Sequence, residues 1–138
     1  MTLAQEFDQG ASLVFGGSGG IGAAIATRIA QGGSDVAITY RSNRERAEAA
    51  AATIAELGVA CTIHQVDIAD KAQIVQAITE AAQRHKRLHS VVVAAGSDIK
   101  QPFLADVTDA QWEEVIAGDL NGFFRIVKNI IPHFRAHG

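Results

Sequence analysis

The stretch FGGSGGIG, residues 15–22, holds five glycines in eight positions. Glycines at this density let the backbone turn sharply and let another molecule approach it closely. Where such a turn joins a strand to a helix, its N–H groups and the positive end of the helix dipole can bind the phosphates of a dinucleotide. We therefore predict a phosphate-binding turn formed by Gly16, Gly17, Ser18, Gly19, Gly20, Ile21 and Gly22. The alternative is a tight turn that binds no ligand.

Three of these glycines have separate expected roles. Gly16 lets the chain leave the strand, Gly20 lets the backbone approach a pyrophosphate, and Gly22 lets the helix pack closely on the sheet. The order of strand, glycine turn, helix and second strand makes this pattern more specific than the glycines alone.

A second polar stretch, Tyr40-Arg41-Ser42-Asn43, follows the next apolar run. An NAD-selective site would carry an acid here to accept hydrogen bonds from the ribose hydroxyls, but the first acid is Glu45. Arg41 can pair with a 2′-phosphate through two N–H groups, and Ser42 and Asn43 can add hydrogen bonds. The stretch therefore favours NADP(H) over NAD(H). The alternative is that these residues only cap the next helix.

The elements that must position these residues alternate between short β-rich runs and longer segments of helical spacing. Strands are expected at 11–16, 34–40, 59–66 and 88–96, and helices at 20–31, 43–57, 70–86 and about 108–134. The third strand is the least apolar, so we place it at an edge. The βαβαβαβα order with right-handed crossovers predicts an α/β fold of Rossmann type. This is a doubly wound parallel sheet of order 3-2-1-4 between two helical layers.

Local signals mark where the helices begin and end. Capping pairs at three helix starts are Ser42 with Glu45, Asp70 with Gln73, and Thr108 with Gln111. Gly32-Gly33 and Gly58 supply the stops. Pro102 is expected in the loop after the fourth strand, and Pro132 is expected to kink or end the last helix.

Composition limits the kinds of protein that this chain can be. It has 138 residues, a formal charge of -3 and one cysteine, Cys61. The length fits one domain, and the charge argues against nucleic-acid or membrane partners. Without an internal disulfide or an apolar run of transmembrane length, the chain is expected in the cytoplasm.

The chain resembles the short-chain dehydrogenase/reductase family over essentially its whole length. The glycine motif has the family's spacing, Gly16-x-x-x-Gly20-Ile21-Gly22, with Phe15 where a threonine is usual. Asp67-Ile68, after the third strand, is similar to the family's pair beside the adenine ring. This resemblance implies that both residues contact the cofactor.

The fourth strand ends in Ala94-Ala95-Gly96, where the family has Asn-Asn-Ala-Gly. Val93 and Ala94 therefore replace two asparagines, which removes one expected bracing interaction of that strand. The resemblance still implies that Ala94, Ala95 and Gly96 lie near the cofactor.

In the last helix the resemblance places Asp119 at the position of the family's catalytic-site asparagine, and Asn121 is two positions too late. Asp119 is therefore a candidate catalytic residue. The alternative is a carboxylate without a catalytic role.

The family's catalytic serine and Tyr-x-x-x-Lys have no counterpart here, and Tyr40 is the only tyrosine. We therefore expect residues 1–138 to form a single NAD(P)-binding domain of Rossmann type. It would be the N-terminal part of a domain of about 250 residues, inactive alone and lacking the family's later strands and helices. The complete protein is expected to transfer hydride between NADP(H) and a small carbonyl or secondary alcohol. Alternatives are a non-catalytic dinucleotide-binding or redox-sensing module, and a flavodoxin-like or nucleotide-sugar-modifying protein.

Other features are weaker signals. The exposed edge of the fourth strand predicts a homo-oligomer, a dimer or a tetramer. The apolar stripe at 123–131 is interpreted as core, with a subunit interface as the alternative. The histidine pairs 85/89 and 133/137 lack a completing acid or cysteine, so no metal site is expected.

Overall fold

The computed structural model describes residues 7, 9–97 and 103–137. Its first part alternates strands and helices: β1 (Ala11–Phe15), α1 (Gly20–Gln31), β2 (Asp35–Tyr40), α2 (Arg44–Ala55), β3 (Cys61–Gln65), α3 (Lys71–His85) and β4 (Leu88–Val93). A 3₁₀ turn (Leu104–Asp106) then precedes a long helical segment made of α4 (Asp109–Val115), a π-helical stretch (Ile116–Gly122) and α5 (Phe123–His137).

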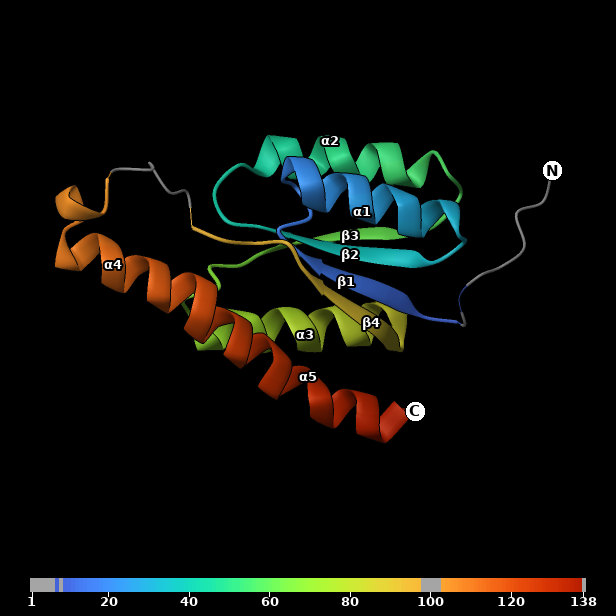
Figure 1. Ribbon diagram of the computed structural model, residues 1–138. Helices are drawn as coiled ribbons and strands as arrows, with labels where there is room; N and C mark the ends of the chain where they lie inside the picture. Colours follow the sequence, from blue (N-terminus) through green and yellow to red (C-terminus); the bar gives the residue numbers. More distant parts are fainter. Residues whose placement is uncertain (1–6, 8, 98–102, 138) are drawn as a thin grey trace.

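The four strands form one parallel sheet in the order β3-β2-β1-β4. Helices α1 and α2 cover one face, and α3 and α5 cover the other (Figure 1). The Rossmann-type fold and the strand order that the sequence predicts are therefore confirmed, including the edge position of β3. Because all strands run the same way, their carboxyl ends meet at one edge, where open α/β sheets bind ligands.

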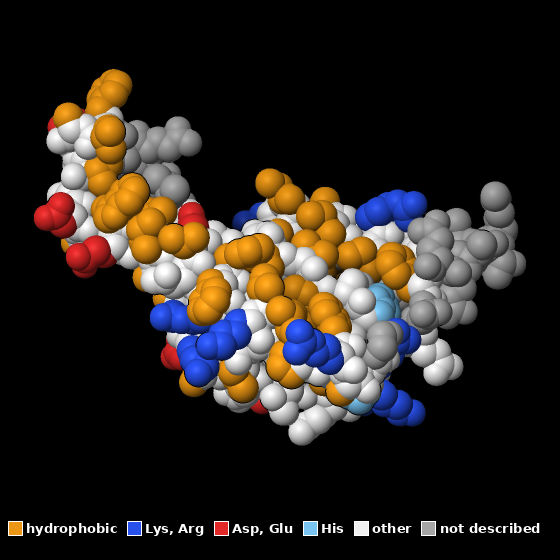
Figure 2. All heavy atoms as spheres, turned by 60° about the horizontal axis from the view of Figure 1, so that its bottom comes forward, with side chains coloured by type: hydrophobic (Ala, Val, Ile, Leu, Met, Phe, Trp, Pro, Cys, Tyr) orange, Lys and Arg blue, Asp and Glu red, His pale blue; other side chains and the backbone are white. Residues whose placement is uncertain are grey.

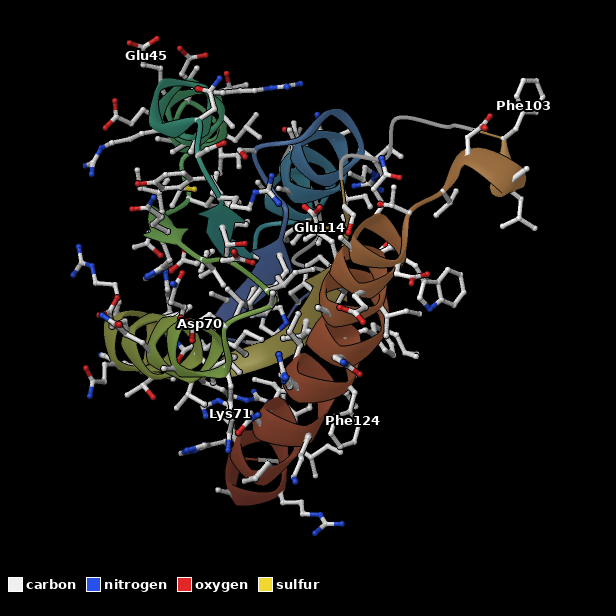
Figure 3. All side chains as sticks on the ribbon, turned by 90° about the vertical axis from the view of Figure 1, so that its left-hand side faces the viewer. Glu45, Asp70, Lys71, Phe103, Glu114 and Phe124 are labelled. Atoms are coloured by element: carbon white, nitrogen blue, oxygen red, sulfur yellow. The ribbon has the colours of Figure 1, made fainter. Side chains whose placement is uncertain are left out.

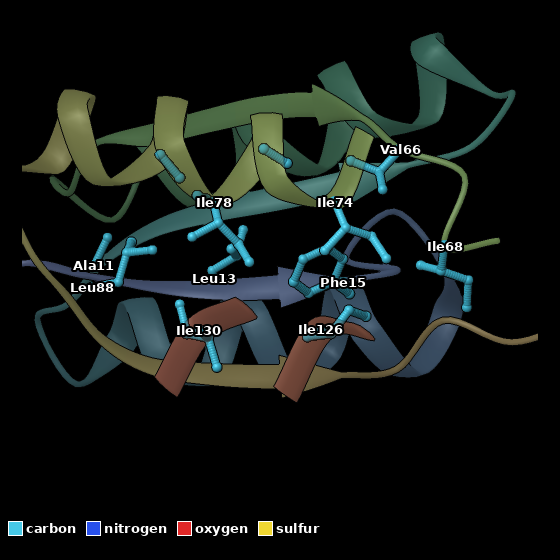
Figure 4. Close-up of a cluster of buried hydrophobic side chains, with 13 residues drawn as sticks. Ala11, Leu13, Phe15, Val66, Ile68, Ile74, Ile78, Leu88, Ile126 and Ile130 are labelled. Atoms are coloured by element: carbon cyan, nitrogen blue, oxygen red, sulfur yellow. The ribbon is translucent and has the colours of Figure 1, made fainter. Parts of the chain in front are cut away.

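The central strand β1 explains why its sequence shows no alternation. Leu13 and Phe15 point into a core that also holds Ile74, Ile126 and Ile130 (Figure 4). Val14 points to the opposite face and packs with Ile38 and Ile54. Both faces of β1 are fully buried, as expected of a central parallel strand. Burying one such large side chain stabilises the fold by about 1.5–3 kcal/mol.

Two predicted N-caps are confirmed and one is wrong. Asp70 accepts hydrogen bonds from the backbone N–H groups of Ala72 and Gln73, and Thr108 makes the full capping box with Gln111. Ser42 does not cap α2. Instead, Asn43 Oδ1 accepts from the backbone N–H of Arg46 at 2.9 Å. Ser42 and Asn43 are adjacent and both favour N-cap positions, so the sequence does not fix the start of the helix to a single residue.

The long C-terminal segment differs from the single helix expected at 108–134. It begins at Asp109, passes through the π-helical stretch and continues past Pro132 to His137, so Pro132 does not end it. Pro102 lies outside the described residues.

The apolar stripe at 123–131 is only partly core. Ile126 and Ile130 are buried, whereas Phe123, Phe124, Val127 and Ile131 are exposed. Within the described residues, no helix has the length and apolar character needed to cross a membrane.

Candidate functional site

A cleft of about 250 Å³ opens at the carboxyl ends of the strands. It brings together eleven of the residues predicted for the cofactor site: Gly16, Ser18, Gly19, Tyr40, Arg41, Ser42, Asn43, Ile68, Ala94, Ala95 and Gly96. Thr39, Arg46 and Val66 complete its lining. Segments that are far apart in the sequence thus meet where the glycine turn leaves β1.

The fold of the chain itself requires a glycine at position 16, independently of any ligand. Its φ of +78° is in the left-handed region, which side chains disfavour. A Cβ there would lie 2.6 Å from the backbone nitrogen of Ala95 and 2.8 Å from the carbonyl oxygen of Ala94. Its N–H donates to Thr39 Oγ1 at 3.0 Å. Gly16 therefore holds the turn against the ends of both neighbouring strands.

Two further glycines of the turn also serve packing. A Cβ on Gly17 would lie 2.6 Å from Cβ of Ile38, and one on Gly22 would collide with the carbonyl oxygen of Gly16. Neither Gly17 nor Gly22 lines the cleft. Gly17 lets the turn lie against β2, and Gly22 lets the first turn of α1 lie against the glycine turn that follows β1.

At Gly20, by contrast, no close contact within the described residues requires a glycine. Among the residues that the structure describes, nothing lies within 4 Å of a Cβ placed at this position. Gly20 and Ile21 form the exposed first turn of α1, and Ile21 is 76% exposed. Neither residue lines the cleft. The open space beside Gly20 fits a group that approaches the backbone from outside the chain.

The start of α1 differs from those of the other α-helices with a described N-cap. Its N-cap is Gly19, which makes no side-chain cap. By contrast, Asn43, Asp70 and Thr108 cap α2, α3 and α4 through their side chains. The first N–H groups of a helix have no partner within the helix. At α1 these groups, together with the positive end of the dipole, suit an anion such as a pyrophosphate.

The second end of the cleft carries two arginines. Arg41 follows β2, and its carbonyl oxygen accepts from Gln65 Nε2 at 3.0 Å, which fixes this loop to the end of β3. Arg46, in the first turn of α2, also lines the cleft. The side chain of Arg46 is exposed, and Arg46 is not among the cofactor residues predicted from the sequence. Its backbone N–H donates to Asn43 Oδ1, the side chain that caps α2.

Arg44, two positions before Arg46, makes its contacts outside the cleft. Its Nε donates to Glu48 Oε1 at 2.7 Å on the exposed face of α2. This bond to Glu48, followed by the nearby Tyr40, raises the pKa of the Arg44 guanidinium. Arg44 does not line the cleft. Two arginines separated by one residue thus point to different surroundings.

The two residues that we expected beside the adenine ring, Asp67 and Ile68, have different surroundings. Ile68 is 8% exposed and forms part of the cleft wall, near which we expected the adenine ring. Asp67 does not line the cleft. Its Oδ1 accepts from the backbone N–H of Ala69 at 2.9 Å, and its own N–H donates to Gln73 Oε1 at 2.8 Å. Asp67 therefore shapes the turn into α3.

Asp119 lies in the π-helical stretch, opposite the end of β4. Its Oδ1 accepts from the backbone N–H of Ser97 at 2.7 Å and from Ser97 Oγ at 3.0 Å. Asp119 therefore positions the chain directly after Gly96, and its catalytic role stays a prediction. Short π-helical stretches occur frequently at functional sites.

Glycines allow this helix to approach the strand ends. A Cβ on Gly122 would lie 2.7 Å from the carbonyl oxygen of Ile68, and one on Gly118 would lie 3.1 Å from Ser97 Oγ. Figure 3 shows the long helix crossing beside the sheet, with Phe103 and Phe124 turned outward.

Cys61 is not suited to nucleophilic chemistry. Burial, and to a smaller extent the nearby Asp35 carboxylate, raise the pKa of its thiol to about 11. A thiol with such a pKa carries little thiolate at neutral pH.

The fold places this chain among the Rossmann-type proteins, with its cleft at the strand ends. Residues 11–138 match the model of the short-chain dehydrogenase family. The chain belongs to this family of oxidoreductases.

Relatives agree with that assignment. The chain is 35% identical to a 3-oxoacyl-acyl-carrier-protein reductase FabG of Aggregatibacter actinomycetemcomitans, over 86% of this chain and 49% of the relative. A crystal structure of a dehydrogenase/reductase from Sinorhizobium meliloti 1021 is 34% identical, with a TM-score of 0.88 over 95% of this chain and 52% of its own. A short-chain dehydrogenase from Burkholderia cenocepacia J2315, in complex with NADP, is 35% identical, with a TM-score of 0.83 over 88% of this chain and 49% of its own. The chain thus spans about half the length of the relatives it matches.

Proposed function

We propose that this chain is the NADP(H)-binding part of an oxidoreductase that interconverts a small carbonyl compound and a secondary alcohol. The cofactor supplies or accepts the hydride when bound. The residues of this chain bind and orient it. The observation that carries the proposal is the start of α1, which has no side-chain cap and faces open space at Gly20 beside the cleft.

The two ends of the cleft suit the two ends of an adenosine diphosphate. The glycine turn offers N–H groups to the pyrophosphate. The wall formed by Val66, Ile68 and Ala95 is apolar and suits the face of an adenine ring. Tyr40, which is 6% exposed, also lines the cleft, and its carbonyl oxygen accepts from the backbone N–H of Val66 at 2.8 Å.

A preference for NADP(H) follows from charge. Arg41 and Arg46 both line the cleft at the end of β2, and its lining holds no aspartate or glutamate among residues 9–97 and 103–137. Two guanidinium groups can pair with a 2′-phosphate, whereas an NAD site calls for an acceptor of the ribose hydroxyls. The Burkholderia relative in complex with NADP supports this preference by analogy.

Calorimetric titration of the 138-residue chain with NADP⁺ and NAD⁺ tests the proposal. We expect saturable binding that is tighter for NADP⁺. Arg41→Ala and Arg46→Ala are each expected to weaken NADP⁺ binding about tenfold, the value of one charge-assisted hydrogen-bonded contact, and to leave NAD⁺ binding little changed. Arg44→Ala is the matched control, because Arg44 pairs with Glu48 outside the cleft.

Equal affinity for both nucleotides would contradict the charge argument. A loss of NADP⁺ binding in Arg44→Ala equal to that in Arg41→Ala would do the same. If the folded chain binds neither nucleotide, the glycine turn serves only packing, and the proposal is wrong for this chain.

We also propose that the protein forms a homo-oligomer in the cytoplasm. The support is the open edge of β4 and the exposed apolar residues of the long helical segment: Trp112, Leu120, Phe123, Phe124, Val127 and Ile131. Figure 2 shows apolar side chains gathered along this helical face, with basic side chains beside them.

A further inference from the structure

Thr39, the second-last residue of β2, is a buried polar residue that is not among the cofactor residues predicted from the sequence. It is 1% exposed, and it lines the cleft. Ala37, two positions earlier and so on the same face of the strand, packs in the core with Leu13 and Phe15. A hydroxyl in such surroundings costs stability unless it is hydrogen-bonded. The role of Thr39 therefore depends on what its hydroxyl contacts.

The hydroxyl of Thr39 contacts the first glycine of the turn. Gly16 donates its backbone N–H to Thr39 Oγ1 at 3.0 Å. The register between β1 and β2 ends with Val14 opposite Ile38, so this bond lies beyond the last pair of the two strands. The Thr39 side chain thus continues the attachment between β1 and β2 into the glycine turn.

The connection continues from Gly16 to the start of α1. The carbonyl oxygen of Gly16 accepts from the backbone N–H of Gly19 at 3.0 Å, and Gly19 is the N-cap of the helix. Gly22, in the first turn of α1, lies so close to the same carbonyl that a Cβ would collide with it. Two hydrogen bonds in series therefore join Thr39 to the helix start that we propose as the pyrophosphate site.

The end of β2 to which Thr39 belongs is held in place from its other side. The carbonyl oxygen of Tyr40 accepts from the backbone N–H of Val66 at 2.8 Å, directly after β3. Arg41, two positions after Thr39, is tied to Gln65 Nε2 through its own carbonyl oxygen. The arginine end of the cleft is thus fixed by the region of β3, and Thr39 attaches the glycine turn to that fixed end.

We propose that Thr39 is a positioning residue of the nucleotide site, whose hydroxyl holds the glycine turn in place relative to the arginine end of the cleft. The inference rests on the proposed function, in which the turn binds the pyrophosphate and Arg41 binds the 2′-phosphate. A site that is ordered before its ligand arrives loses less conformational freedom on binding, and so it binds more tightly. Thr39 therefore contributes to affinity through Gly16, without selecting between nucleotides.

The two ends of the cleft allow affinity and preference to be measured separately. The pyrophosphate is common to NADP⁺ and NAD⁺, so a displaced glycine turn weakens the binding of both nucleotides alike. Only NADP⁺ carries the 2′-phosphate, so a change at Arg41 alters the ratio of the two affinities. This ratio distinguishes a variant of Thr39 from a variant of Arg41.

Calorimetric titration of Thr39→Val with both nucleotides tests the proposal, because valine is similar in shape but cannot accept from the Gly16 N–H. We expect the affinities for NADP⁺ and NAD⁺ to fall by the same factor, about threefold to tenfold, the value of one neutral hydrogen bond. Thr39→Ser keeps the hydroxyl and is expected to bind both nucleotides like the unchanged chain. Thr53→Val is the matched control, because the hydroxyl of Thr53 donates to the Ala49 carbonyl on α2, outside the cleft.

Two results of this titration would overturn the proposal. If Thr39→Val lowers the free energy of unfolding in urea while both affinities stay unchanged, the hydroxyl serves stability alone. If only the affinity for NADP⁺ falls, Thr39 acts at the 2′-phosphate instead of at the turn. If Thr39→Val does not fold, Thr39→Cys carries the same comparison, because its sulfur is a weaker acceptor than the hydroxyl oxygen.

Amide NMR of the chain without nucleotide tests the attachment of the turn separately. In Thr39→Val we expect the Gly16 amide hydrogen to exchange faster with solvent and the Gly19 amide resonance to move. The amide of Ala47, which donates to the Asn43 carbonyl on α2, is expected to stay unchanged. An unaltered Gly16 amide would contradict the proposal. If the unchanged chain binds neither nucleotide while the Gly16 amide responds, the proposed function is wrong, whereas the attachment of the turn to β2 is confirmed.

Discussion

Gly16 and Gly20 are separated by four positions, yet the chain depends on them for different reasons. Gly16 has a φ of +78° and lies against Ala94 and Ala95. Gly16→Ala is expected to lower the free energy of unfolding by about 2 kcal/mol or more, since a left-handed backbone and a close contact both act against a Cβ. Urea denaturation measures this loss, and an unchanged midpoint would contradict the geometry of the turn.

Gly20→Ala is the contrasting variant. Among the described residues, nothing lies within 4 Å of a Cβ there, and the residue begins α1. Its free energy of unfolding is expected to stay unchanged or to rise by up to about 1 kcal/mol, because alanine favours the helix. Its affinity for NADP⁺ in the calorimeter is expected to fall. A destabilised Gly20→Ala would show that this glycine serves folding instead.

At the scale of elements, the long helical segment depends on one glycine where it crosses the sheet. A Cβ on Gly122 would lie 2.7 Å from a backbone oxygen that cannot turn aside, whereas the one contact of a Cβ on Gly118 within the described part of the chain is the hydroxyl of Ser97. Gly122→Ala is expected to destabilise the fold by about 1–3 kcal/mol, the usual cost of overpacking. Gly118→Ala is expected to cost less. Thermal unfolding of the two variants compares them, and equal losses would contradict this difference.

His133 ties α5 to the start of β4. Its Nε2 accepts from the backbone N–H of Leu88 at 3.0 Å. Burial lowers the pKa of His133, and His137 and Arg87 add to the lowering. The unfolded chain therefore binds more protons than the folded one once the pH falls below about 6.5. The stability that neutral His133 contributes is present above that pH and is lost as the pH falls through its lowered pKa.

Urea denaturation at about pH 7.5 and about pH 5.5 checks this sign. His133→Gln keeps a possible acceptor but cannot be protonated in this range. The variant is expected to lose less stability on acidification than the unchanged chain. A greater loss in the variant would contradict the lowered pKa.

These elements also show what the sequence could and could not predict. The strand order, the glycine turn and the caps at Asp70 and Thr108 rest on local periodicity and on residue types with strong backbone preferences. Arg46 was missed as a cleft residue because the sequence does not show which exposed side chains of α2 face the end of β2. The π-helical stretch depends on close contacts of Gly122 and Gly118 with distant segments, which periodicity does not report.

At the scale of the whole molecule, the exposed face of the long helical segment is where we expect copies of the chain to associate. Phe124 is 59% exposed, and Lys128 lies over its ring. We expect the chain to sediment as more than a monomer and Phe124→Glu to shift it toward the monomer. Leu57→Glu is the control, because Leu57 is 42% exposed on the far side of the sheet. A monodisperse monomer before any substitution would contradict the proposed association.

The position of β1 in the middle of the sheet also determines when the cleft is completed during synthesis. The glycine turn leaves the ribosome early, and β2 can pair with β1 soon after. The other wall of the cleft is Ala94, Ala95 and Gly96, which follow β4, so it must wait for most of the chain. Pairing across such a sequence separation is slow. A growing chain therefore has the glycine turn long before it has the complete cleft, and β1 keeps an unpaired edge throughout that interval.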